Sequence, residues 1–263
     1  MAAKLPHAMK INYCSDLHLN QCSKQAIKSI FEELSKPAEF LIIAGDFFSK
    51  NIVNYSGGEC SEEMIFDHQK LIQQSMQVLS DFKNPVFWIP GNHEFHGMKI
   101  ADLEKEYQSI IPSNVEFLHN KTSKLGNYKI VGSTMWYDVT DYKGSSTYHI
   151  HDFIDDFPLE SSRCKSFLEN EVTNNSIVVT HMLPSYQSVH SVWRAAKSNV
   201  VFVREMDDLI LNQKPHIWFY GHSHNPVDEY FIGSTKLLTN PRGSNKEIKQ
   251  NQSWTMKTLE LPS

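Results

Sequence analysis

The 263-residue sequence has no excess of basic side chains. Lys and Arg number 25 against 30 Asp and Glu, which gives a net charge of −5 at pH 7. Proteins that are drawn to duplex nucleic acid or anionic membranes by their overall charge carry a positive excess. The composition therefore excludes a global electrostatic pull toward such partners and leaves open only a local basic rim. We expect no partnership with duplex nucleic acid.

Cysteine is scarce, and long apolar runs are absent. The four cysteines (Cys14, Cys22, Cys60 and Cys164) form no Cys-x-x-Cys pair and no zinc-finger spacing. Isolated cysteines are typical of free thiols in a reducing compartment. No segment approaches the ~20 apolar residues that a membrane span needs, and residues 1–10 lack the apolar run of a signal peptide. We therefore expect a cytoplasmic protein without a membrane partner.

Linkers and repeats are missing as well. The 11 glycines and 11 prolines are not gathered into a tract, and no segment repeats. The hydrophobic fraction, 40%, is ordinary for a globular protein with a sizeable core. The length suits one large α/β domain. We predict a single domain over residues 1–263.

Strand and helix patterns alternate in the first half of the chain. Strand-like segments lie at 9–15, 40–44 and 86–89. Apolar residues at helical spacing predict helices at 24–35 and 61–82. This alternation indicates βαβ crossovers and a parallel sheet.

The second half is richer in strands. The strand-like segments are 115–118, 128–131, 177–180, 217–220, 229–232, 235–238 and 253–259. Two stretches, 137–160 and 184–199, show little pattern. Long irregular segments in compact domains often line binding sites.

Metal-ligand side chains follow five of the predicted strands. The five segments are Asp16-Leu17-His18, Gly45-Asp46, Gly91-Asn92-His93-Glu94, Thr180-His181 and Gly221-His222-Ser223-His224. In open α/β sheets, ligands bind beyond the carboxyl ends of the strands, so these residues can converge. Residues two apart in an extended segment point the same way, as His222 and His224 would. The mixed nitrogen and oxygen donors suit borderline transition metals: Mn, Fe, Zn, Co or Ni.

Each motif alone is weak, because a lone Asp after a strand usually caps a turn or helix and a lone His is usually a semi-buried residue. The ordered set is specific: DLH, GDF, GNHE, VVTHM and GHSH. It resembles the calcineurin-like metallophosphoesterase superfamily, over the span from Asp16 to His224. The resemblance implies an α/β fold, a four-layer αββα sandwich with two mixed β-sheets flanked by helices.

The resemblance also implies a ligand set and a reaction. By matching position, Asp16, His18, Asp46 and His224 would hold one metal ion. Asp46, Asn92, His181 and His222 would hold the other, so that Asp46 bridges both. A metal-dependent hydrolase of small phosphomonoesters or phosphodiesters follows, acting through a dinuclear centre and a bridging hydroxide.

Three further residues have roles implied by their place beside these ligands. His93 matches the catalytic histidine of the superfamily, which would protonate the leaving oxygen or steady the transferring phosphoryl group. Glu94 is expected to orient a ligating or catalytic imidazole. His96 is the best placed of the remaining histidines for a similar supporting contact.

Other segments carry weaker hypotheses. Residues 132–136, 184–185 and 240–243 resemble a bacterial-type subgroup of the superfamily whose substrate is unassigned. Trp136 is either a core aromatic or a residue lining the site. Arg242 could clamp a phosphate, but a position after Asn-Pro favours an exposed turn residue.

Two groups of basic or histidine side chains fall in the segments with little pattern. His190, Arg194 and Lys197 could meet an anionic substrate, although a solvated helix face is the favoured interpretation. His149 and His151 could belong to a lid or, in the favoured interpretation, to a plain loop.

Two rival functions remain. A metal-dependent nuclease would share the motifs, but such enzymes usually add DNA-binding segments and a basic groove. A non-catalytic scaffold is disfavoured because His93 and all seven inferred ligands are present. The sequence indicates neither the oligomeric state nor the substrate, since specificity lies in loops.

Overall fold

The computed structural model describes residues 8–52, 60–138, 157–243 and 254–261. His149 and His151 lie outside the described residues, so the lid and loop alternatives for them stay as predictions.

The first sheet has five strands in the order β11-β1-β2-β3-β4. Their bounds are β1 Met9–Cys14, β2 Phe40–Ala44, β3 Val86–Ile89, β4 Val115–Phe117 and β11 Lys257–Leu261. Strands β1 to β4 run parallel, and β11 pairs with β1 antiparallel. The parallel part confirms the βαβ crossovers that the sequence predicts, and it brings the carboxyl ends of β1, β2 and β3 to one edge.

The second sheet has six strands in the order β5-β6-β7-β8-β10-β9. Their bounds are β5 Lys121–Leu125, β6 Tyr128–Ser133, β7 Ser176–Thr180, β8 Ile217–Tyr220, β9 Tyr230–Ile232 and β10 Thr235–Thr239. Strands β6, β7, β8 and β10 are parallel, whereas β5 and β9 are antiparallel edge strands. Both sheets are therefore mixed.

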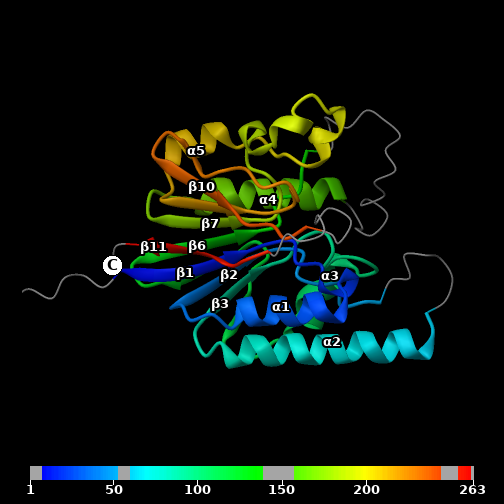
Figure 1. Cartoon of the computed structure of the whole chain (residues 1–263). Coiled ribbons are helices and arrows are strands. Elements are labelled where there is room, and N and C mark those ends of the chain that lie inside the picture. The colour runs from blue at the N-terminus through cyan, green and yellow to red at the C-terminus, as the bar shows by residue number, and fades with distance from the viewer. Residues whose placement is uncertain (1–7, 53–59, 139–156, 244–253, 262–263) are drawn as a thin grey trace, which may run out of the picture.

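Helices cover the outer faces of both sheets (Figure 1). Helices α1 (Lys24–Leu34), α2 (Glu62–Asp81) and α3 (Ile100–Gln108) lie on the side of the first sheet, and α4 (Phe157–Glu171) and α5 (Asp207–Gln213) lie on the side of the second. The side chains of Ser23 and Ser61 cap the starts of α1 and α2 by accepting backbone N–H bonds. The four layers confirm the αββα sandwich. No helix in the described ranges is long and apolar enough to cross a membrane.

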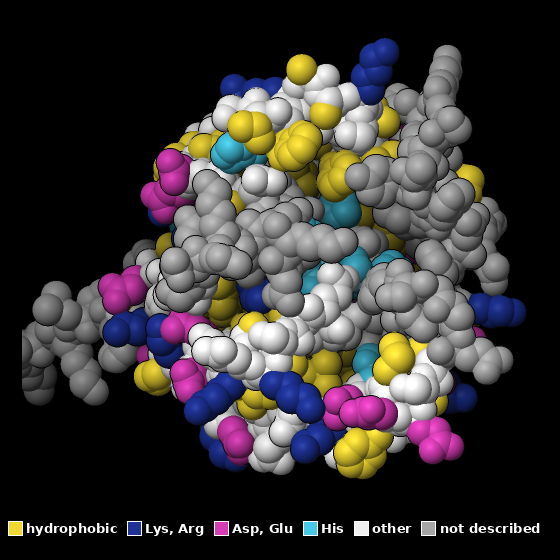
Figure 2. Space-filling model, turned by 45° about the vertical axis from the view of Figure 1, so that its right-hand side comes forward, with side chains coloured by type: hydrophobic (Ala, Val, Ile, Leu, Met, Phe, Trp, Pro, Cys, Tyr) yellow, Lys and Arg dark blue, Asp and Glu magenta, His cyan; other side chains and the backbone are white. Residues whose placement is uncertain are grey.

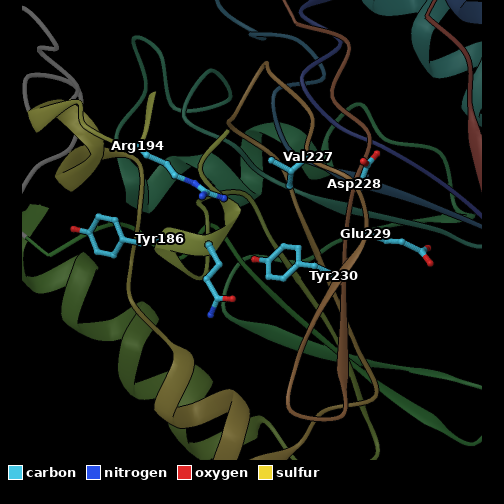
Figure 3. Close-up of a pocket in the computed structure, with 7 residues that line it drawn as sticks. Tyr186, Arg194, Val227, Asp228, Glu229 and Tyr230 are labelled. Carbon is cyan, nitrogen blue, oxygen red and sulfur yellow. The ribbon is translucent and has the colours of Figure 1, made fainter. Parts of the chain in front are cut away.

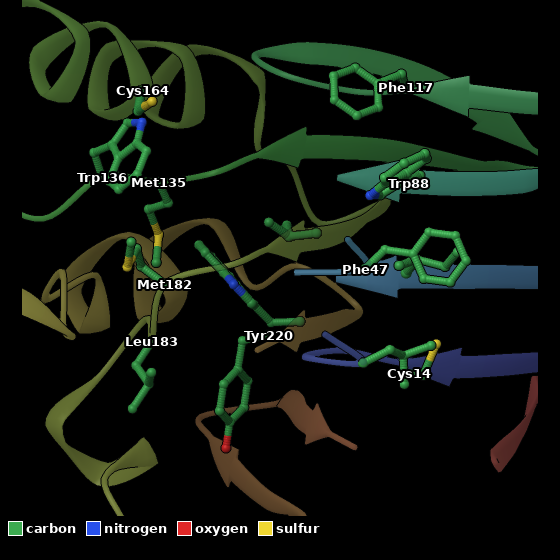
Figure 4. Close-up of a cluster of buried hydrophobic side chains, with 14 of the residues drawn as sticks. Cys14, Phe47, Trp88, Phe117, Met135, Trp136, Cys164, Met182, Leu183 and Tyr220 are labelled. Carbon is green, nitrogen blue, oxygen red and sulfur yellow. The ribbon is translucent and has the colours of Figure 1, made fainter. Parts of the chain in front are cut away.

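Two apolar cores hold the layers together. Between the sheets, Tyr13 of β1 meets Phe219 of β8 with ring centroids 5.0 Å apart, among aliphatic side chains such as Ile42 and Val179. A larger core packs the outer faces against the helices (Figure 4). Trp136 is fully buried there, against Phe95 and Phe157, so its interpretation as a core aromatic is confirmed.

Some element predictions were incomplete. The sequence analysis did not find β5, whose KTSKL sequence alternates polar residues on an edge strand. It also missed α3, α4 and α5; α4 begins inside the stretch 137–160 and has few apolar side chains to mark a helical face. The last strand, β11, is Lys257–Leu261, whereas the sequence predicted a strand at 253–259, so the observed strand ends two residues later.

Candidate metal centre

The five motif segments meet at one edge of the sandwich, where each follows its strand. Backbone bonds join them: Asp16 N–H donates to Gly45 O over 2.9 Å, and His18 N–H donates to Asp46 O over 2.9 Å. Across the sheets, the Nδ1–H of His181 donates to Ala44 O at 2.9 Å, since a carbonyl can only accept. Parallel strands in both sheets thus place residues that are over 200 positions apart in one cluster.

Four of these residues adopt a left-handed backbone conformation. The φ angles of Asp16, His18, Asp46 and His222 are 54°, 45°, 54° and 65°. Such values are uncommon for residues other than glycine and recur at functional sites, where the surrounding structure holds them. A close approach adds a further constraint: a Cβ atom at Gly91 would collide with the Asp46 carboxylate.

Asp16, His18 and His224 form the first group of donor atoms, which all lie within 4.8 Å of one another. The Nε2 atoms of His18 and His224 are 2.9 Å apart, and the Nε2 of His224 is 3.6 Å from Oδ1 of Asp16. The Asp16 carboxylate also accepts the backbone N–H of His222. Two imidazole nitrogens and a carboxylate oxygen therefore face one point.

The second group contains Asp46, His181 and His222. The Nε2 of His181 lies 3.5 Å from Oδ1 of Asp46 and 3.0 Å from Oδ1 of Asn92. Oδ2 of Asp46 lies 3.7 Å from the Nε2 of His18, which belongs to the first group. Asp46 is thus the residue between the two groups.

The donor set fits two cations. Asp16 and Asp46 are completely buried, and no Lys or Arg in the described part of the chain pairs with either carboxylate. Buried carboxylates require compensating positive charge. The buried Nε2 of His222 has no hydrogen-bond partner among the described residues, and a bound cation would satisfy such an atom.

The electrostatics of the cluster favour the metal-ligating protonation state for His18, His222 and Asp46, whereas burial raises the pKa of Asp16. Burial lowers the pKa of His18 and His222, which keeps both imidazoles neutral. Burial raises the pKa of Asp46, but the charges of His181 and His93 outweigh it and hold this pKa well below its usual value. For His181 the balance is reversed: burial lowers its pKa, but Asp46 raises it to about 9.

His93 lies over the Asp46 carboxylate. Its backbone N–H donates to Oδ1 of Asp46 at 2.8 Å, and its Nε2 lies 3.8 Å from Oδ2. The ring contacts His18 at a centroid distance of 4.4 Å and His96 at 4.3 Å. Burial lowers the pKa of His93 despite the opposing charge of Asp46. His96 therefore packs against His93, and its supporting role stays a prediction.

Glu94 acts on the backbone and not on an imidazole, which corrects the expected contact. Its carboxylate accepts the backbone N–H groups of Asp46, Phe47 and Gly91 at 3.0, 2.8 and 2.6 Å, with a longer bond of 3.4 Å from Phe48. The side chain is fully buried. Glu94 thus fastens the loop after β2 to the loop after β3.

Arg242 is buried, so the favoured interpretation as an exposed turn residue was wrong. Its backbone N–H donates to Ser15 O at 3.1 Å, and its guanidinium donates to Gly243 O at 3.1 Å and Leu17 O at 3.5 Å. The residue packs against the segment that carries Asp16, because β10 lies beside β8 and returns the chain to β1.

The basic residues of segment 184–199 lie on short 3-10 turns and not on one helix face. These turns are η4 (Tyr186–Ser188), η5 (Ser191–Trp193) and η6 (Lys197–Val201). The His190 side chain accepts the backbone N–H of Val192 and caps η5. Arg194 and Lys197 are exposed, as predicted for solvated side chains.

Sequence reasoning missed Phe202 and the carbonyl of Ala44. The Phe202 ring covers His222 at a centroid distance of 4.6 Å. Neither contact has a sequence signal, because a backbone acceptor has no residue type and Phe202 follows a segment without pattern. In the space-filling view, histidine side chains gather near the middle of one face, with hydrophobic side chains above them (Figure 2).

Comparisons with known proteins agree with this geometry. The family model described as calcineurin-like phosphoesterase matches residues 9–226. An uncharacterized protein, L509, of Acanthamoeba polyphaga mimivirus is 22% identical, over 90% of this chain and 92% of that protein. Phosphopantetheinyl hydrolase from Mycobacterium tuberculosis has a similar structure, with a TM-score of 0.63, 14% identity and 95% of each chain covered. A dimetal phosphatase from Danio rerio is also similar in structure, with a TM-score of 0.54 and 12% identity. The match covers 96% of this chain and 92% of that protein.

Proposed function

The chain belongs to the calcineurin-like phosphoesterase family and is a hydrolase of phosphoester bonds, and from this premise we propose that it hydrolyses small phosphomonoesters or phosphodiesters. The observation that carries the proposal is the meeting of two donor groups, one around Asp16 and one around His181, with Asp46 between them. The dimetal phosphatase among its structural neighbours supports two cations at these groups.

In this proposal each group holds one cation. Asp16, His18, Asp46 and His224 bind the first, and Asp46, Asn92, His181 and His222 bind the second. The hydrogen bond from His181 to Ala44 O supports this, because it fixes the ring so that its Nε2 faces Asn92 and Asp46. The nitrogen and oxygen donors favour Mn, Fe, Zn, Co or Ni.

Bound at such a site, two metal ions polarise a phosphoryl group and supply a nucleophile from water near neutral pH. The protein residues position the substrate and handle the proton. The His93 side chain is 16% exposed, against 1% for His18 and 0% for His181, so a substrate at the cluster can contact it. We propose that it donates a proton to the leaving oxygen, or a hydrogen bond to the phosphoryl group.

The test compares two histidines at opposite ends of β8. His222 follows the strand at the cluster, whereas His216 precedes it and stacks on Tyr128 at the other edge. With Mn added, we expect hydrolysis of p-nitrophenyl phosphate or its bis ester by the unchanged protein and by His216→Ala. His222→Ala should lose most of the turnover and bind less metal by elemental analysis. Absence of metal-dependent turnover on both esters, in folded protein, would refute the proposal.

A further inference from the structure

An open groove lies among the loops that follow the motif residues His181 and His224 (Figure 3). It has a volume of about 580 Å³ and is lined by Tyr186, Gln187, Arg194, Val227, Asp228, Glu229 and Tyr230. One wall comes from η4 and from Arg194, which follows η5. The other comes from residues 227–229 of the connection between β8 and β9 and from Tyr230, the first residue of β9. This volume is in the range of pockets that bind small organic molecules.

The groove is built from the same loops as the cluster. Val227 follows His224 by three residues, and three residues span at most ~10 Å. The other wall begins at Tyr186, three residues after Leu183, whose N–H donates to Phe202 O at 3.1 Å, and the Phe202 ring packs on His222. Both walls of the groove therefore lie within a few residues of segments that contact or contain the cluster histidines.

Among the described residues, the groove is lined by one cation, Arg194, by the carboxylates of Asp228 and Glu229, and by aromatic and apolar side chains such as Tyr230 and Val227. The side chains of Arg194 and Tyr230 point toward its middle, whereas those of Asp228 and Glu229 point away (Figure 3). The hydroxyl of Tyr230 bonds to Ser188 at 2.6 Å, which holds the ring in place. Arg194 is exposed, and its guanidinium has no ion pair or hydrogen bond within the described ranges. The guanidinium is thus available to a ligand.

We propose that this groove binds the leaving group of the substrate, and that Arg194 pairs with a second anionic group on it. The inference rests on the proposed phosphoester hydrolysis and narrows its substrate class to esters that carry a further phosphate or carboxylate. A guanidinium recognises both anions through two parallel N–H bonds. The ring of Tyr230 and the side chain of Val227 offer the leaving group's carbon skeleton an apolar wall.

The experiment uses three esters that share one ring: phenyl phosphate, 4-carboxyphenyl phosphate and benzene-1,4-diyl bisphosphate. The measured quantity is kcat/KM for each charged ester divided by kcat/KM for phenyl phosphate. We expect Arg194→Ala to lower one or both ratios by about tenfold or more, as charge-assisted hydrogen bonds are strong. Arg194→Lys keeps the positive charge, so its ratios should lie between those of Arg194→Ala and the unchanged protein. Lys197→Ala, an exposed cation of the same segment outside the groove, should leave the ratios unchanged.

The three esters differ in the intrinsic reactivity of their leaving groups. This difference is the same for every variant, so it cancels when the kcat/KM ratios of two variants are compared. The carboxylate and bisphosphate arms show which anion Arg194 prefers. A second measurement is calorimetric titration of the Mn-loaded protein with phenylphosphonate and with benzene-1,4-bisphosphonate. Arg194→Ala should bind the bisphosphonate more weakly than the unchanged protein does and should bind phenylphosphonate equally well.

Ratios that are equal in Arg194→Ala and the unchanged protein, together with equal phosphonate binding, would overturn the inference. Hydrolysis of phenyl phosphate in that same experiment would leave the proposed function standing. If no ester is hydrolysed, the proposed function fails, and the phosphonate titration alone decides whether Arg194 binds a second anion.

Discussion

Asp46 is the residue on which the candidate centre depends most. It is buried, it lies between the two donor groups, and its carboxylate is the anionic group nearest to His18, His93 and His181. Asp16 and Asp46 bring two carboxyl groups into the interior, and burial lowers the pKa of His18 and His222, whereas Asp46 raises the pKa of His181 to about 9. The cluster is therefore arranged to receive cations.

Asp46→Asn should cripple both sites. The substitution keeps the size of the side chain and its oxygen but removes the negative charge between the groups. We expect elemental analysis after Mn loading to find two metal ions in the unchanged protein and one or none in the variant. Asp208→Asn, at an exposed position in α5, is the matched control and should keep two. Two ions retained in Asp46→Asn would contradict the bridging role.

His93→Ala should separate proton donation from metal binding. The variant should keep both ions, because His93 is not among the proposed ligands, and lose roughly 10²–10⁴-fold in turnover, the usual contribution of a general acid or base. The loss should be smaller for p-nitrophenyl phosphate than for an alkyl phosphate, because p-nitrophenolate leaves without a proton. Equal losses on both esters would show that His93 acts only by stabilising charge.

Glu94 matters at the scale of the elements, because it joins the turn after β2 to the turn after β3. Glu94→Ala would leave four buried backbone N–H groups without their acceptor, each at a cost of ~1–3 kcal/mol. We expect the free energy of unfolding to fall by at least about 3 kcal/mol. Urea unfolding of metal-free protein measures this directly, since any loss of bound metal then has no effect.

The control for Glu94 is Glu116→Ala, on the exposed face of β4. It removes a carboxylate of the same size with no buried donor behind it, and it should change the unfolding free energy little. Similar losses in Glu94→Ala and Glu116→Ala would show that the backbone contacts of Glu94 do not stabilise the two turns.

The elements that the sequence predicts correctly are those with strong periodicity. Buried parallel strands such as β2 and β3 are short apolar runs, and α2 carries a regular apolar stripe. By contrast, β5 and α4 have weak patterns because only part of each is buried and their place comes from tertiary contacts. Pattern reasoning finds what a segment specifies locally and misses what its neighbours impose.

The same limit applies to the site. The ligand candidates could be predicted because their order along the chain is specific and each follows a strand. Glu94 and Arg242 were misjudged because their partners are backbone groups from distant segments: the turn after β2 for Glu94, and the turn after β1 for Arg242. No spacing in the sequence encodes such a contact.

At the scale of the whole molecule, the sandwich gives a compact site and a mixed surface. The two sheets present their motif loops at one shared edge, so the cluster is formed by both halves of the chain. Lys and Arg side chains of the described residues are interspersed with Asp and Glu around the face that carries the histidines (Figure 2). The groove lined by Arg194 has the volume of a small ligand, about 580 Å³.

This surface leads us to expect no tight binding of duplex DNA. Binding to a duplex depends on many Lys and Arg contacts with phosphates, and its affinity falls steeply with salt. The sequence has 25 basic residues against 30 acidic ones, and within the part of the chain that the structure describes the groove is lined by a single cation, Arg194. Gel-shift assays between about 50 mM and 200 mM salt should show no retained duplex at micromolar protein.

The control is activity: hydrolysis of bis(p-nitrophenyl) phosphate by the same Mn-loaded sample would show that the protein is active. Tight, salt-sensitive binding of duplex or single-stranded DNA together with efficient cleavage would instead establish a nuclease.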